Sequence, residues 1–196
     1  MKKILLGSAL AGVFFMASCD NKKNDSVKDA ENINEQKMKD SIVTMDKDDE
    51  KFMVKAANGG MMEVQLGKWA HEHAISKEVQ MFGHHMMEDH QKGNDQLKEL
   101  AMKKKITLPD SVDNDTKEEI KKLAAKKGKD FDKDYASMMV SDHKEDIKLF
   151  EDASNNAKDP DLKEWASSTL PTLRMHLDMA QKMDSAMKAM NKKKKK

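Results

Sequence analysis

Residues 77–104 have the sequence KEVQMFGHHMMEDHQKGNDQLKELAMKK, and the spacing of their apolar side chains predicts a long amphipathic helix. One stripe recurs at steps of three or four residues: Val79, Phe82, Met86, His90, Gly93, Leu97 and Leu100. This spacing follows the 3.6-residue period of an α-helix. Leu108-Pro109-Asp110 ends the pattern, because proline disfavours helical backbone at the residue before it.

The same spacing occurs in three other segments, over residues 46–76, over residues 130–155 and from Pro160 past Met183. A shorter helix is expected over residues 116–126. The chain has 8 Gly and 3 Pro in 196 residues, which disfavours turn-rich sandwiches and barrels. We therefore predict an all-α fold: a four-helix bundle over residues 47–190, with a short extra helix between its second and third long helices.

One polar residue interrupts the apolar stripe of each long helix. In chain order, these residues are Glu63, His90, His143 and His176. Burying a carboxylate or an imidazole without a partner is costly, so we expect the four side chains to meet at one level of the bundle. A metal-free network of hydrogen bonds and ion pairs would satisfy them. So would one transition-metal ion such as Zn, Fe or Cu, for which three imidazoles and a carboxylate are a common ligand set.

A short motif occurs twice, as Met86-Met87-Glu88-Asp89-His90 and as Met139-Val140-Ser141-Asp142-His143. Consecutive residues of a helix point about 100° apart, so each aspartate faces away from its own histidine. Asp89 and Asp142 could instead accept a hydrogen bond from a histidine of a neighbouring helix and orient it as a metal ligand. A salt bridge to one of the many lysines is an equally open alternative.

The start of the chain has the features of an export signal. Lys2 and Lys3 precede an apolar run that is too short to span a membrane. The run ends in Met16-Ala17-Ser18-Cys19, which resembles the lipobox of bacterial lipoproteins, where the cysteine is lipidated and becomes the mature N-terminus. We predict a lipoprotein signal peptide over residues 1–18 and a lipidated Cys19 that anchors the protein to a membrane of the cell envelope, on its periplasmic or outer-membrane face. An ordinary cleaved signal is the alternative.

The two ends of the chain are rich in charged and polar residues. Residues 19–46 contain few apolar side chains to offset the entropy of ordering, so we predict a flexible tether, part of which could be helical. Residues 191–196 form a lysine tail. The formal net charge of +1 includes this tail, so the body is not basic and no nucleic-acid partner is expected.

Taken together, these segments resemble the Domain of Unknown Function 4142 family, exported bacterial proteins with a ferritin-like four-helix bundle that are often labelled as outer-membrane proteins. The resemblance covers roughly residues 46–183. It rests on the segment AANGGMMEVQLG at 56–67, the two Asp-His motifs, FDKDY at 131–135, LFE at 149–151, and LPTL at 170–173 leading to His176 and Leu177. It implies export and a ferritin-like bundle, and it supplies no activity.

Di-iron chemistry is disfavoured, because ferritin-like di-iron bundles use Glu-x-x-His on two helices and this sequence contains no such motif. It also lacks a nucleophile elbow and a glycine-rich phosphate loop, so no catalytic residue is assigned and a non-enzymatic role is preferred. We expect a bundle that binds one metal ion for storage, sensing or protection. The alternative is a structural or stress-related envelope bundle with a metal-free Glu/His network.

Overall fold

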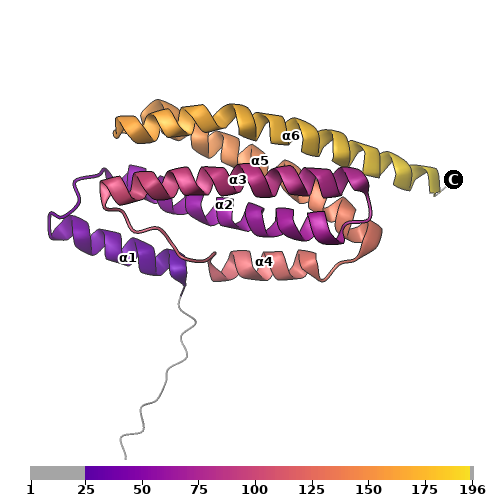
Figure 1. Cartoon of the computed structure of the whole chain (residues 1–196), viewed down its shortest axis with the longest axis horizontal. Coiled ribbons are helices and arrows are strands. Elements are labelled where there is room, and N and C mark those ends of the chain that lie inside the picture. Colours follow the sequence, from indigo (N-terminus) through magenta and orange to yellow (C-terminus); the bar gives the residue numbers. More distant parts are fainter. Residues whose placement is uncertain (1–24, 195–196) are drawn as a thin grey trace, which may run out of the picture.

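A computed structural model describes the backbone of residues 25–194 and the side chains through residue 189. This part of the chain forms six α-helices and no strand. The helices are α1 (Ser26–Lys39), α2 (Lys47–His73), α3 (Lys77–Lys104), α4 (Asn114–Ala124), α5 (Gly128–Asn156) and α6 (Pro160–Lys194) (Figure 1). The prediction of an all-α helical bundle is confirmed.

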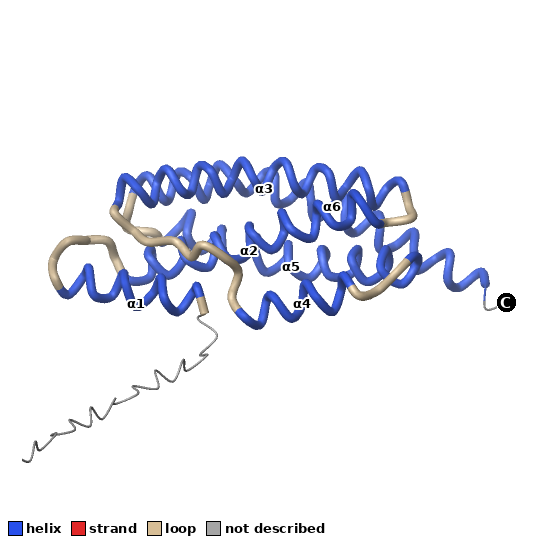
Figure 2. The backbone as a smooth tube through the Cα atoms, turned by 60° about the horizontal axis from the view of Figure 1, so that its bottom comes forward, coloured by secondary structure: helices blue, strands red, loops and turns tan. Residues whose placement is uncertain are grey.

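The four long helices lie alongside one another (Figures 1 and 2). Helix α2 packs against α3 and α5, and α6 packs against α5 and α3. The two short helices lie on the outside, where α1 contacts α2 and α4 contacts both α2 and α5. The long helices begin and end within a few residues of the predicted bounds, and α6 continues through Pro171.

Aspartate side chains determine where two of the long helices begin. Asp46 accepts a hydrogen bond from the backbone N–H of Asp48 at 2.9 Å and caps α2. Asp159 accepts one from the N–H of Leu162 at 3.0 Å and caps α6. The buried carboxylate of Asp49 accepts a hydrogen bond from the N–H of Asp159 at 2.7 Å. This last contact ties the start of α6 to the first turn of α2.

Helices α2 and α3 approach each other closely at two glycines. A Cβ atom at Gly67 would lie 2.7 Å from the carbonyl oxygen of Gly83, and a Cβ atom at Gly83 would lie 2.6 Å from the carbonyl oxygen of Gly67. Neither position accepts a side chain unless the backbone moves. The crossing lies one helical turn from Glu63, so it fixes the spacing of α2 and α3 beside the predicted site.

A layer of polar side chains divides the apolar core into two clusters. One cluster contains Phe52 and Phe150, and the other contains Phe82 and Tyr135. On each long helix the buried residues that flank the layer belong to different clusters: Ala57 and Leu66 on α2, Met86 and Leu97 on α3, Met139 and Phe150 on α5, and Leu173 and Ala180 on α6. The predicted polar residues lie between these pairs.

Within residues 19–46, predicted as a tether that could be partly helical, Ser26–Lys39 form α1. Asn34 of this helix is buried, and its Nδ2 atom donates hydrogen bonds to Glu50 Oε1 at 2.7 Å and to the carbonyl oxygen of Thr107 at 2.9 Å. Its Oδ1 atom accepts one from the N–H of Thr107 at 2.7 Å. This amide and further hydrogen bonds of Ser26 and Lys37 with residues 105–111 hold the helix in place, so the bundle begins before residue 47.

The predicted signal peptide over residues 1–18 and the predicted lipidation site Cys19 lie outside the described residues, as do the side chains of the lysine tail over residues 191–196. Among residues 25–194, no helix has a stretch that is both long and apolar enough to cross a bilayer. Export and membrane anchoring therefore stay predictions.

Candidate metal centre

The four polar residues of the helical stripes lie together in the layer that divides the core. Glu63 comes from α2, His90 from α3, His143 from α5 and His176 from α6, and all four side chains are buried. The centroids of the three imidazole rings lie 5.2 to 5.6 Å apart. Four helices thus bring one acidic and three imidazole side chains to the same level of the bundle.

Two of the imidazoles bond to carboxyl groups through one ring nitrogen. His90 Nδ1 lies 2.8 Å from Glu63 Oε2, which comes from the adjacent helix α2. His176 Nε2 lies 2.9 Å from Asp89 Oδ2, which comes from α3. A carboxylate oxygen accepts hydrogen bonds, so it places the proton on the nitrogen that faces it.

His143 bonds to a backbone oxygen of its own helix. Its Nδ1 atom lies 3.1 Å from the carbonyl oxygen of Met139 and 3.5 Å from Glu63 Oε1. A carbonyl oxygen accepts hydrogen bonds and cannot donate them, so His143 Nδ1 carries the proton. The Nε2 atom of a neutral ring then has a free lone pair.

The second nitrogen of each imidazole is buried and has no hydrogen-bond partner. These atoms are His90 Nε2, His143 Nε2 and His176 Nδ1. Each of the three histidines offers one ring nitrogen within 4.8 Å of those of the other two. Nitrogen ligands of one tetrahedral ion lie about 3.4 Å apart at metal–nitrogen distances of about 2.0–2.1 Å. Small movements of the rings would therefore bring three nitrogens onto one ion.

Burial keeps the three histidines uncharged at neutral pH. It lowers the pKa of His90 to about 4, that of His143 to about 3 and that of His176 to about 4, from an ordinary value of 6.5. At His143 and His176, repulsion from a neighbouring imidazole lowers the pKa further. Neutral imidazole is the form that binds a metal ion, so the rings need not lose a proton before they act as ligands.

Asp146 on α5 joins the cluster, although it was not among the predicted residues. It hydrogen-bonds to Glu63, and each of Glu63, His143 and Asp146 offers one ligand atom within 4.8 Å of those of the other two. Burial raises the pKa of both carboxyl groups well above their ordinary values. One proton shared between two carboxyl groups in contact removes the repulsion between two like charges.

Comparisons with known proteins place the chain in a family. The model of the family described as Domain of unknown function (DUF4142) matches residues 34–183. This chain belongs to the DUF4142 family. The match begins at Asn34, the residue whose hydrogen bonds hold α1 against the rest of the bundle.

A solved structure shares the fold of this DUF4142 chain. The crystal structure of a DUF305 fragment from Deinococcus radiodurans has a TM-score of 0.63 and 10% sequence identity, over 74% of this chain and 98% of that chain. At this identity the likeness concerns the fold alone. A search of curated proteins found no match.

The two aspartates of the repeated motif take different positions in this DUF4142 protein. Asp89 bonds to His176 on a neighbouring helix, which is the geometry expected of an orienting group. Asp142 bonds to no imidazole among the described residues. Its Oδ2 atom is buried without a hydrogen-bond partner, and burial raises its pKa to about 7. The orienting role predicted for Asp142 therefore has no counterpart in the structure.

The carboxyl group of Glu63 does not face the ring nitrogens of His90 and His143 that lack hydrogen-bond partners. Its two oxygens face the Nδ1 atoms of His90 and His143, whereas the nitrogens without partners on these two rings are the Nε2 atoms. A carboxylate bonded to the N–H of a ligand histidine fixes the tautomer and orientation of the ring. Glu63 can therefore orient His90 through Oε2. Its Oε1 atom is buried without a hydrogen-bond partner and belongs to a group with His143 and Asp146 that could hold a metal ion, so its predicted place as a ligand stays a prediction.

Proposed function

We propose that this DUF4142 protein binds one transition-metal ion through His90 Nε2, His143 Nε2 and His176 Nδ1. The observation that carries the proposal is the set of three buried ring nitrogens without hydrogen-bond partners. A buried polar atom left unpaired costs about 1–3 kcal/mol, and one ion would satisfy all three nitrogens together. Three imidazoles are a known ligand set for such an ion and leave a further position for water or a small ligand.

The contacts around the three rings support this proposal. Each ring bonds through its other nitrogen to a carboxyl or carbonyl oxygen, as histidine ligands of metal ions do in most metalloproteins. A negative charge left on the carboxyl pair of Glu63 and Asp146 when an ion binds would offset part of the charge of a divalent ion. Glu63 and the three rings are also buried, which strengthens both effects.

The donor set favours metals that accept imidazole, namely Zn, Fe or Cu. We propose a ferritin-like four-helix bundle that holds the ion for storage, sensing or protection and does not carry out rapid turnover. A two-iron site of the usual ferritin kind is not proposed, since that site needs bridging carboxylates from Glu-x-x-His motifs.

Metal analysis of the purified protein tests the proposal. Untagged residues 20–196, prepared without chelators, should retain or take up one ion of Zn, Fe or Cu for each chain. His143→Ala should not, because it removes a ligand from the centre of the cluster. Equal metal content in the two proteins would overturn the proposal, provided that circular dichroism shows both to be helical.

A metal-free polar network in a structural envelope bundle is the second candidate. It is favoured by the contacts of Glu63, which already bonds to His90 and Asp146 and lies near His143. Such a network would need water molecules at the three remaining ring nitrogens. The same metal analysis decides between the candidates, because a network without metal predicts no uptake by the unsubstituted protein.

We further propose that Cys19 is lipidated and holds the domain at a membrane of the cell envelope. The proposal is supported by the charged start, the short apolar run and the small residues before the cysteine. Expression of the whole chain in a bacterium with a labelled fatty acid should place label and protein in the membrane fraction. Cys19→Ser should lose the label, and label retained by this variant would count against the anchor.

A further inference from the structure

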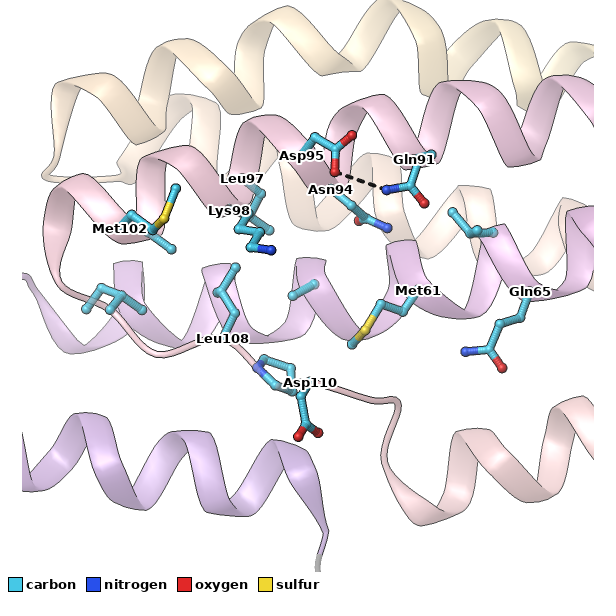
Figure 3. Close-up of a pocket in the computed structure, with 15 residues that line it drawn as sticks. Met61, Gln65, Gln91, Asn94, Asp95, Leu97, Lys98, Met102, Leu108 and Asp110 are labelled. Atoms are coloured by element: carbon cyan, nitrogen blue, oxygen red, sulfur yellow. Dashed lines mark hydrogen bonds between the residues drawn. The ribbon is translucent and has the colours of Figure 1, made fainter.

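Two cavities meet at Asn94 of α3. The larger, of about 620 Å³, is an open groove between α2, α3 and the segment 106–110. The smaller, of about 40 Å³, lies inside the bundle against Glu63, His90 and Asp146. Asn94 lines both cavities, and in Figure 3 its amide points from α3 toward α2. The groove outside the bundle and the space beside Glu63 and His90 are therefore separated at this side chain.

Gly60 of α2 provides the room that the Asn94 amide occupies. A Cβ atom at Gly60 would overlap Asn94 Oδ1 and would lie 3.1 Å from Asn94 Cγ. The amide thus packs directly on the backbone of α2. Because a side chain turns about its χ angles far more readily than a helix backbone moves, Asn94 is the movable part of this barrier.

The small cavity is polar on the side of the candidate site. A volume of about 40 Å³ has room for a water molecule, and carboxyl groups of Glu63, Asp89 and Asp146 lie around it. The groove outside holds the thioethers of Met61 and Met102 and the carboxylate of Asp95 within its lining. Potential metal ligands thus lie on both sides of Asn94. Thioether and carboxylate groups line the groove, and carboxyl groups and the imidazole of His90 line the small cavity.

We propose that Asn94, seated on Gly60, is the gate through which a metal ion passes between the groove and the histidine cluster. This inference rests on the proposed metal site and adds its route of entry. In the closed position the amide covers the small cavity. When Asn94 turns toward the groove, the cavity opens, and the amide oxygen can replace a water ligand of the ion as it passes.

A gate changes the rates of binding and release by the same factor and leaves the affinity unchanged, because it acts on the path and not on the bound state. A Cβ atom at Gly60 takes the place of Asn94 Oδ1, so Gly60→Ala should displace the amide from its closed position and speed both rates by about tenfold. Asn94→Ala removes the amide and should also speed both rates. Equal acceleration of binding and release at unchanged affinity is not expected from damage to the metal ligands themselves.

Gln96→Ala is the matched control. Gln96 lies two residues from Asn94 on the same helix, is exposed and lines neither cavity. The change removes an amide side chain from α3, as Asn94→Ala does, without reaching the proposed path. We expect its rates to equal those of the unsubstituted protein.

Stopped-flow mixing of the purified protein with Zn²⁺, and in parallel with Cu²⁺, measures binding, and release is followed after addition of excess chelator. Faster exchange in both Gly60→Ala and Asn94→Ala, at equal dissociation constants and with the control variant unchanged, supports the gate. If both variants bind the ion with unchanged rates, the gate is overturned and the ion enters elsewhere, for example past the partly exposed Asp89. If the unsubstituted protein binds neither ion at equilibrium, the proposed metal site fails and the gate fails with it.

Discussion

Two buried polar clusters of the bundle differ in how completely their hydrogen bonds are made. Asn34 on α1 uses both its amide nitrogen and its amide oxygen, in bonds to Glu50 and Thr107. In the polar layer, each of the three histidines bonds through one ring nitrogen and leaves the other without a partner. The first cluster is complete with protein atoms alone, and the second is not.

This difference separates a contact that holds the fold from a site that awaits a ligand. A buried cluster with every bond made contributes to stability and has no use for a further group. A cluster with several unpaired atoms pays a cost in the folded state that a suitable ligand removes. Substitutions at Asn34 should therefore change stability and spare metal binding, and substitutions at the histidines should chiefly change metal binding.

The largest effect is expected from His143→Ala. Loss of a ligand should weaken metal binding by more than the factor of about 100 that marks the upper range for loss of an orienting group. Saturating metal, at about 100–1,000 times the dissociation constant, should raise the free energy of unfolding by about 3–4 kcal/mol in the unsubstituted protein and by far less in the variant. Calorimetric titration and urea unfolding measure the two quantities. His73→Ala, at an exposed position on α2, is the control.

Asn34→Ala should produce the largest loss of stability that leaves the metal site intact. It strips Glu50 and Thr107 of their buried partner, for which we expect about 2–4 kcal/mol of destabilisation in urea unfolding. Ile33→Ala changes the preceding residue, which is exposed, and should be nearly neutral. Metal affinity lost in Asn34→Ala would contradict the separation of the two clusters.

Asp89→Ala should weaken metal binding less than loss of a ligand does. The side chain of Asp89 is 37% exposed, so water can take its place beside His176 Nε2. We expect a loss of affinity of about tenfold, at the lower end of the range for orienting groups. Asp95→Ala, on the same helix and bonded to Gln91, should bind metal normally. An equal loss in the two variants would assign the effect to charge alone.

The smallest effect is expected from Glu50, in the pH dependence of the free energy of unfolding. Burial raises the pKa of this carboxyl above 4.5, although its hydrogen bond from Asn34 opposes the shift. Between the two pKa values the folded state holds more protons than the unfolded state, so the free energy of unfolding falls as pH rises through this window. Glu50→Gln keeps an acceptor for Asn34 and cannot ionise. Its profile should show a smaller decline, because Glu63, Asp142 and Asp146 also have raised pKa values and still contribute. The exposed Glu35→Gln should leave the decline unchanged.

The helical period alone predicts the long helices and the centre of the site. Glu63, His90, His143 and His176 lie on stripes that have to face the core, so their convergence follows from the packing of four helices. Asp146 also carried a signal, since residues three apart lie on one helical face and it follows His143 by three. As a partly exposed charged residue it resembles many others on the surface, and only the neighbouring Glu63 distinguishes it.

Two features could not be predicted from the sequence: the packed helix α1, and the lack of a bond between Asp142 and an imidazole among the described residues. Each has a physical reason. The burial of α1 depends on polar contacts of Asn34, Ser26 and Lys37 with partners on α2 and in residues 105–111, which are distant in sequence and cannot be identified from the local pattern. Asp142 follows the same motif as Asp89, but the rotation of each helix about its own axis decides which aspartate reaches a ring nitrogen. The sequence of a motif on one helix does not specify how that helix is rotated about its axis in the bundle.

The polar layer also affects how the bundle unfolds. The cluster around Phe52 and the cluster around Tyr135 are separated by side chains that bury little apolar surface, so each end of the bundle can open with limited loss of contacts at the other. We expect native-state hydrogen exchange of the apoprotein to resolve two cooperative units along the long axis. An ion shared by α3, α5 and α6 would join them into one, and occupancy would then set the resistance of the whole domain to proteolysis.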